Sequence, residues 1–161
     1  MPSKTLLLCG ALGLIIMGAL VGTGLFVSRD THLVLEGKIQ RVRASEVRAG
    51  ASVVIADVKL TNPSGYPFMI KSADIEIIAA DGKTLTGRFI PEVDAKPMFS
   101  VLPALGDKFN PTIAIRESVK PKSTVERMVA TVFEHPIGVI ESRKGLVIRF
   151  KDVDGPVSEL R

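Results

Sequence analysis

The chain has 161 residues, and its 21 Lys and Arg against 17 Asp and Glu give a formal net charge of +4 at pH 7. This mildly basic and well-mixed balance argues against a nucleic-acid partner, because such a partner requires a concentrated basic face. The single cysteine is Cys9. Residues 28–161 therefore contain no disulfide and must rely on a hydrophobic core, which a chain of this length can build.

The first predicted element is a transmembrane anchor helix at Thr5–Val27, preceded by a short N-terminal tail, Met1–Lys4. The run contains no charged residue, and about 20 apolar residues are enough to cross a hydrocarbon core of about 30 Å as a helix. A cleaved signal peptide with a cleavage site at residues 22–24 is the alternative, although the apolar core of such peptides is usually only about 7–15 residues long. Membrane lipid is therefore the first expected partner, through Thr5–Val27.

The charges around the predicted anchor bear on its orientation. Lys4 lies on one side, and Arg29, Lys38, Arg41 and Arg43 follow on the other. A literal count of these charges places the large domain in the cytoplasm, but long folded segments translocate largely regardless of charge. We expect a single-pass protein of the bacterial inner (cytoplasmic) membrane with its C-terminal domain outside the cytoplasm.

Residues 28–161 form one domain by size and show the two-residue alternation of β-strands. Asn62-Pro63-Ser64-Gly65 and Asp81-Gly82 are turn sequences, and the latter predicts a hairpin. Residues 43–52 are expected to be a charged connection. The pattern predicts an all-β fold, an antiparallel immunoglobulin-like β-sandwich of about seven strands preceded by one transmembrane helix. The expected strands are 32–42, 53–60, 68–80, 84–90, 112–119, 124–134 and 146–153.

A long proline-rich loop at 91–111 interrupts this pattern, and loops of such length in compact domains are usually functional or carry structure of their own. Its apolar residues have helical spacing, so we expect a short helical turn that is limited by Pro103. If the apolar side chains fold back, they plug the open end of the sandwich. If they stay exposed, they form a patch that marks a partner or ligand site. The candidate residues of this loop and its leading edge are Phe89, Ile90, Met98, Phe99, Val101, Leu102, Leu105 and Phe109.

A second candidate surface follows the predicted anchor closely. Cations near a membrane surface each contribute about 1 kcal/mol of attraction to anionic headgroups. Glu36 and Glu46 dilute the positive charge, so an ordinary solvated face is the alternative. The candidate lipid-headgroup residues are Lys38, Arg41, Arg43 and Arg48.

Residue types that perform chemistry are sparse. His32 and His135 are far apart in sequence and have no identifiable partner, which a catalytic base requires. Residues 152–155 resemble the start of a calcium loop but lack the later ligands, so they are interpreted as a turn. Glu92 and Asp94 are interpreted as a solvated edge. We expect no cofactor, no metal site and no enzymatic activity.

One segment resembles a known family. Val58-Lys-Leu-Thr-Asn62-Pro63-Ser-Gly-Tyr-Pro-Phe-Met-Ile70 is similar to the strand–Asn-Pro–strand element of the water-stress and hypersensitive-response domain of late-embryogenesis-abundant proteins. The order of the 75–85 hairpin and the 121–133 strand is similar too, over about residues 32–153, and the 91–111 loop is additional to that pattern. The chain also resembles uncharacterised bacterial exported proteins with one anchor and such a sandwich. The resemblance implies an immunoglobulin-like, non-enzymatic fold and carries over no functional residue.

Three functions are compatible with these observations. The leading one is a membrane-tethered binding or assembly module with the 91–111 loop as its contact surface. The second is an envelope stress-protective protein of the late-embryogenesis type, as the resemblance implies. The third is an unrecognised hydrolase that uses Asp94, Glu92 or His135 for acid–base chemistry.

Overall fold

The structure is a computed structural model that describes residues 13–14, 17–19, 21–23, 34–153 and 155–161. The chain divides into two compact units, Met1–His32 and Leu33–Arg161. The predicted tail and most of the predicted anchor Thr5–Val27 lie outside the described residues, and the described residues within the anchor are helical. Among the residues with described positions, none belongs to a helix of sufficient length and apolarity for a membrane crossing.

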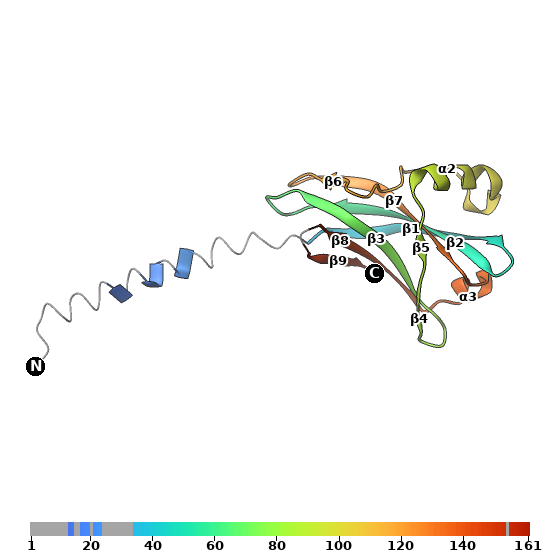
Figure 1. The fold of residues 1–161 in the computed structure, drawn as a ribbon, viewed down its shortest axis with the longest axis horizontal. Coiled ribbons are helices and arrows are strands. Elements are labelled where there is room, and N and C mark those ends of the chain that lie inside the picture. The colour runs from blue at the N-terminus through green and yellow to red at the C-terminus, as the bar shows by residue number, and fades with distance from the viewer. Residues whose placement is uncertain (1–12, 15–16, 20, 24–33, 154) are drawn as a thin grey trace, which may run out of the picture. The chain divides into compact units, whose positions relative to one another are not determined.

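The second unit is a mostly-β antiparallel sandwich of two sheets (Figure 1). The first sheet has the order β1-β2-β7-β5, and the second has the order β4-β3-β8-β9, with β6 paired to β3. Neighbouring strands within each sheet run antiparallel. The strands are β1 (Glu36–Arg48), β2 (Ala51–Thr61), β3 (Phe68–Ile78), β4 (Thr84–Thr86), β5 (Arg88–Phe89), β6 (Ser118–Val119), β7 (Thr124–Phe133), β8 (Gly145–Asp152) and β9 (Val157–Leu160).

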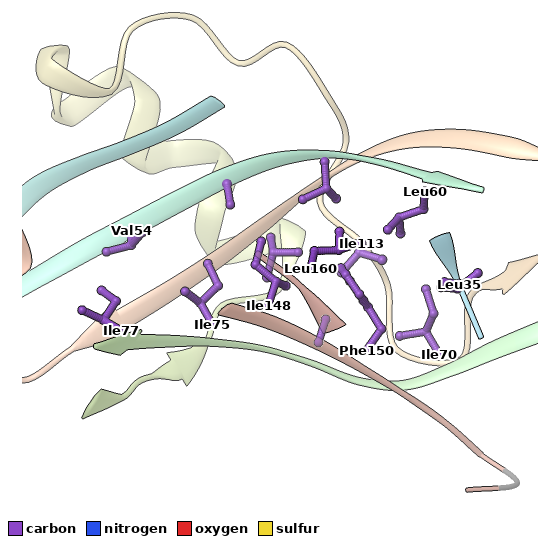
Figure 2. Packing of buried hydrophobic residues seen from close by; sticks show 14 of the residues in the cluster. Leu35, Val54, Leu60, Ile70, Ile75, Ile77, Ile113, Ile148, Phe150 and Leu160 are labelled. Atoms are coloured by element: carbon purple, nitrogen blue, oxygen red, sulfur yellow. The ribbon is translucent and has the colours of Figure 1, made fainter. Parts of the chain in front are cut away.

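The main core lies between the two sheets and is built from the alternating inward side chains of their strands. Figure 2 shows Val54 and Leu60 of β2 directed toward Ile75 of β3 and Phe150 of β8. Because successive strand residues point to opposite faces, every second side chain of these strands points into the interior and fills it. The largest fully buried side chains include Phe68, Phe133 and Phe150.

A second core lies on the outer face of the first sheet. Here the helix α2 (Glu92–Val101) and the 3-10 helix η2 (Pro103–Leu105) cover the sheet on the side away from β8 and β9 (Figure 1). Strand β2 is therefore buried on both faces. The buried members of this second core are Val53, Ile55, Ile90, Ala95, Leu105, Met128 and Ala130.

The expectation that the 91–111 loop plugs the open end of the sandwich is therefore wrong. Several of its apolar side chains do fold back, but onto the face of the first sheet. The physical reason is that this outer face of the sheet is apolar and is more stable when it is buried from water. Its apolar side chains are Val53 and Ile55 of β2 and Met128 and Ala130 of β7. The helix is also longer than the short turn that was expected, and it contains Pro97. Pro103 begins η2 after the helix ends.

Several strand boundaries differ from the prediction. Strand β1 continues to Arg48, and a tight turn with Gly50 at φ 78° follows it, so residues 43–52 are not a connection. Of the predicted strand 112–119, only β6 and a bridge between Thr112 and Met128 form. Strand β9 and the short helix α3 (Ile137–Glu141) were not predicted. These elements are too short to give a clear periodicity.

The predicted strand 84–90 is divided between the two sheets at Gly87. Strand β4 pairs with β3 in the second sheet, and β5 pairs with β7 in the first. A Cβ atom at Gly87 would lie 2.3 Å from Thr131 Cγ2 and 2.7 Å from the Val132 carbonyl oxygen. Glycine is required here because the backbone at this position approaches β7 too closely to leave space for a side chain.

The Asn-Pro turn after β2 joins two loops at one end of the sandwich. The Asn62 side chain is buried; its Nδ2 donates to the carbonyls of Tyr66, at 2.8 Å, and Val119, at 3.0 Å. Its Oδ1 accepts from Ser64 N at 3.0 Å and Ser64 Oγ at 2.7 Å. The loop between β2 and β3 is thereby held against the turn between β6 and β7 (Figure 1).

Candidate functional site

The outer surface of the 91–110 segment, which we call the α2 face, presents exposed apolar side chains. Val101 is 73% exposed and Phe109 is 56% exposed, and both were predicted to contact a partner. Val93, which was not predicted, is 81% exposed. Isolated apolar residues on a surface are common, whereas contiguous apolar patches mark interaction sites.

The other predicted contact residues lie underneath this surface. Leu105 is fully buried, and Met98, Phe99 and Leu102 are half-buried against the second core. Phe89 is half-buried against the main core, while Ile90 is buried in the second core. The structure thus brings the predicted residues together around one segment but exposes only Val101 and Phe109 to a large extent.

A buried arginine attaches this segment to the sheet. Arg43 of β1 donates from Nη1 to the carbonyls of Leu105, at 2.5 Å, and Asp107, at 2.6 Å. Its Nη2 donates to Asp57 Oδ2 at 2.8 Å, and Asn110 Nδ2 donates to Asp57 Oδ1 at 3.1 Å. The side chains of Arg43 and Asp57 are only 11% and 4% exposed. We call Arg43, Asp57 and Asn110 the arginine clasp, because they join both ends of the 105–110 loop to the sheet.

The exposed ring of Phe109 is also held by arginines. The guanidinium carbon of Arg41 lies 4.3 Å from the ring centroid, and that of Arg43 lies 5.3 Å from it. Arg43 is also 5.3 Å from the ring centroid of Phe99. Cations at these distances are attracted to the face of an aromatic ring. Phe109 is therefore exposed but fixed in place.

A second ion pair joins the start of α2 to the 105–110 loop, and a hydrogen bond joins it to the chain that follows. Glu92 Oε1 lies 2.9 Å from Lys108 Nζ, and Glu92 Oε2 accepts from Thr112 N at 2.8 Å. Burial alone would raise the pKa of Glu92, but the hydrogen bonds from Lys108 and Thr112 outweigh it and lower the pKa to about 2. A carboxylate with so low a pKa is a weak base at neutral pH.

The lowered pKa of Glu92 predicts that acid weakens the attachment of α2 to Lys108 and Thr112. The folded-state pKa of about 2 lies below the ordinary value of 4.5, so Glu92 stabilises the fold above about pH 4.5 and loses this contribution as the pH falls toward about 2. In urea unfolding followed by circular dichroism, Glu92→Gln should be less stable than the wild type near neutral pH, and the difference should shrink over that window. Glu46→Gln, at an exposed carboxylate without an ion pair in the described structure, is the control. A difference that stays constant across the window would contradict the assignment.

A groove of about 340 Å³ adjoins the α2 face. Phe89, Ile90, Met98 and Val132 supply apolar lining, and this volume is near the lower end of the range for ligand sites. An ion pair of 2.7 Å between Arg48 and Glu134 lies at its rim. The rim also contains Arg88 and Asp94, neither of which forms an ion pair with another described residue.

The predicted lipid-headgroup residues are distributed along β1. Arg43 belongs to the clasp, Arg41 stacks on Phe109, and Arg48 pairs with Glu134. Lys38 is exposed near the other end of the strand. Because a strand rises about 3.3 Å per residue, Lys38 and Arg48 are about 30 Å apart, and the four cations do not form one patch. Their contact with lipid stays a prediction.

The described contacts do not join the candidate catalytic residues in one site. Glu92 is held by Lys108 and Thr112, and Asp94 is exposed in the first turn of α2. The backbone carbonyl of His135 accepts from Ser52 Oγ at 2.9 Å. His32 and Asp154 lie outside the described residues. Within the described part of the chain, no group of three or more His, Cys, Asp and Glu residues is placed to hold a metal ion.

Comparison with known proteins finds structural similarity between this chain and one solved structure. It is similar to an uncharacterized β-sandwich protein from Clostridium difficile 630, with 17% sequence identity and a TM-score of 0.44. The match covers 79% of this chain and 84% of the other. No family model and no curated protein matches the chain.

Proposed function

We propose that the protein is a non-enzymatic binding module, anchored in the bacterial inner membrane by Thr5–Val27, whose extracytoplasmic sandwich binds a protein partner on the α2 face. The observation that carries this proposal is the exposure of Val93, Val101 and Phe109 on a segment that the arginine clasp fixes to the sheet. A rigid apolar surface binds at a smaller entropic cost than a flexible loop does.

The anchor is supported by the sequence and by the few described residues within it. Thr5–Val27 contains no charge. Leu14, Met17 and Val21 are exposed on helical backbone. Apolar side chains on the outside of a helix are favourable in lipid and unfavourable in water.

The immunoglobulin-like classification is supported by the strand order. In that fold one sheet has the order A-B-E-D, and the other contains C, F and G, with C′ added beside C in some members. The orders β1-β2-β7-β5 and β4-β3-β8-β9 follow this pattern in chain sequence. On this assignment α2 and η2 are an insertion between strands D and E.

The groove beside the α2 face indicates the chemistry of the partner. Its apolar lining suits an aliphatic or aromatic side chain, and Arg88 is an exposed cation that lacks an ion pair with other described residues. Strand β5 also pairs on one side only, with β7. We therefore assign to the partner an extended apolar segment with an acidic residue that reaches Arg88, an arrangement in which backbone groups of an edge strand also contribute.

The proposal is tested by capture of the same partner with matched variants. The pair Val101→Ser and Phe109→Ser should reduce capture about tenfold or more, because removal of a central apolar anchor typically costs over 1 kcal/mol. Val157→Ser, which changes an exposed apolar residue outside the α2 face, should leave capture unchanged. Arg88→Glu should reduce capture, whereas Lys144→Glu should not. Unchanged capture by the folded double variant would contradict the proposal.

A further inference from the structure

A second group of exposed apolar side chains lies at the end of the sandwich where the chain enters β1. Val34 precedes the buried Leu35 there, and Leu35 N donates to Ser158 Oγ of β9 at 2.7 Å. Tyr66 of the β2–β3 loop and Val153 of the β8–β9 loop are 53% and 45% exposed. Figure 1 shows these two loops and the β6–β7 turn at the same end of the domain.

Hydrogen bonds between the loops make this end one surface. Lys122 N donates to the carbonyl of Ser64 at 3.3 Å, and Lys122 Nζ reaches the carbonyl of Pro63. Val153 N donates to the carbonyl of Met69 at 3.1 Å, and Arg116 N donates to that of Ile70 at 2.7 Å. The exposed apolar residues are therefore held together and not on independent loops. We call this surface the loop end; its exposed apolar residues are Val34, Tyr66, Met69, Ile115, Val153 and Val157.

The loop end is also rich in exposed cations. Arg116, Lys120, Lys122 and Lys151 are exposed on its loops and strand ends. Among the acids described near it, Asp152 is buried and accepts from Met69 N, and Glu117 is paired with Arg127. Glu36 is the exposed acid at the start of β1. Among the described residues of this end, the charge that faces outward is therefore predominantly positive.

Two of these cations occupy backbone positions that favour glycine. Arg116 has φ 67° and Lys122 has φ 53°, and they are the non-glycine residues with positive φ in the described part of the chain. A side chain in this conformation is strained relative to glycine. Both strained positions carry a positive charge, and both lie at the loop end.

We infer that the loop end docks on the surface of an anionic bilayer, with Tyr66 and Val153 in the interfacial region and Arg116, Lys120, Lys122 and Lys151 near the headgroups. Apolar side chains and cations on one surface are the combination that binds such membranes. Residues 28–34 extend at most about 25 Å, so a membrane that holds Thr5–Val27 is within reach of this end. The inference rests on the proposed anchor and not on the proposed protein partner.

Tryptophan fluorescence tests this inference directly, because the chain contains no tryptophan. The full chain with Tyr66→Trp, Val153→Trp or, as control, Val101→Trp is reconstituted in vesicles that contain phosphatidylglycerol and brominated acyl chains. Bromine quenches only a tryptophan close to the acyl region. We expect strong quenching and a blue shift for Tyr66→Trp and Val153→Trp, and at least severalfold weaker quenching for Val101→Trp.

The variant Arg116→Gly with Lys122→Gly separates docking from folding. Glycine relieves the strained backbone, which offsets the loss of the bond from Lys122 Nζ to the Pro63 carbonyl, so the thermal midpoint should change little. Quenching of the Tyr66→Trp probe should decrease severalfold and should respond less to salt. Equal quenching at positions 66 and 101, or no effect of the double glycine variant, would overturn the inference. Flotation of the same vesicles reports the anchor separately: a chain that does not float refutes the anchor, whereas a chain that floats without quenching at position 66 refutes only the docking.

Discussion

Replacement of Arg43 by alanine is expected to lower the free energy of unfolding by about 3–5 kcal/mol, because it leaves the Asp57 carboxylate buried without its counter-charge. It also removes the donors to the carbonyls of Leu105 and Asp107. The 105–110 loop should then separate from the sheet. Urea unfolding measures the first effect, and limited proteolysis of the loop under native conditions measures the second.

A double variant distinguishes the charge from the packing. Arg43→Met with Asp57→Leu removes both partners of the clasp and keeps similar volumes, so it should recover most of the lost stability. The Nε of Arg43 is buried without a hydrogen-bond partner, which further favours recovery. An Arg43→Ala variant within about 0.5 kcal/mol of the wild type, the size of an ordinary surface change, would show that the clasp does not hold the loop.

Replacement of Phe150 by alanine should cost about 3–5 kcal/mol, the usual range for loss of a buried phenylalanine. Phe150 is fully buried between the sheets, where it lies among Ile70, Ile113 and Leu160 (Figure 2). Because the surrounding core relaxes only partially, the cost includes both the lost burial of the ring and the cavity that it leaves. The thermal midpoint and the urea midpoint should fall together.

Phe109→Ala is the matched control for this substitution. Its ring is 56% exposed and contacts Arg41 and Arg43, so its loss should cost less than about 1 kcal/mol. Similar losses for Phe109→Ala and Phe150→Ala would contradict the position of the main core. The comparison also tests whether Phe109 contributes to binding. If it does, Phe109→Ala should reduce partner capture more than it reduces stability.

The strand pattern of the sequence predicted much of the fold. The strands near 53–60, 68–80, 124–134 and 146–153 form within a few residues of their expected bounds, because one or both faces of each are apolar and the turns between them contain glycine or proline. The two-sheet sandwich follows from these strands. The periodicity did not indicate that the predicted strand 84–90 is divided at Gly87. This change of sheet depends on a close approach of Gly87 to Val132, which exists only in the folded chain.

The candidate site was predicted in part. The apolar 91–111 loop was identified, but its position was not, although a signal was present. Val53 and Ile55 make the second face of β2 apolar, and a strand that is apolar on both faces needs a cover on each. The clasp was not predicted because Arg43 and Asp57 meet only through the register of β1 with β2, in which Arg43 pairs with Ile55 and Arg41 with Asp57.

The Asn62-Pro63 element has a structural explanation. Buried Asn62 satisfies the carbonyls of Tyr66 and Val119 and fixes the β2–β3 loop. An asparagine in this role suits any sandwich that must join these loops. The resemblance to the water-stress domain therefore concerns a turn that the fold needs, and it does not by itself favour a stress-protective function.

Site-specific photo-crosslinking from Val101 in the membranes of living cells tests whether the α2 face binds a protein. We expect a discrete protein adduct from position 101 that is lost when Phe109 is replaced by serine, and no such adduct from position 157 at the loop end. The absence of a protein adduct at position 101, or the same adduct from both positions, would contradict the assignment of the α2 face as the binding surface.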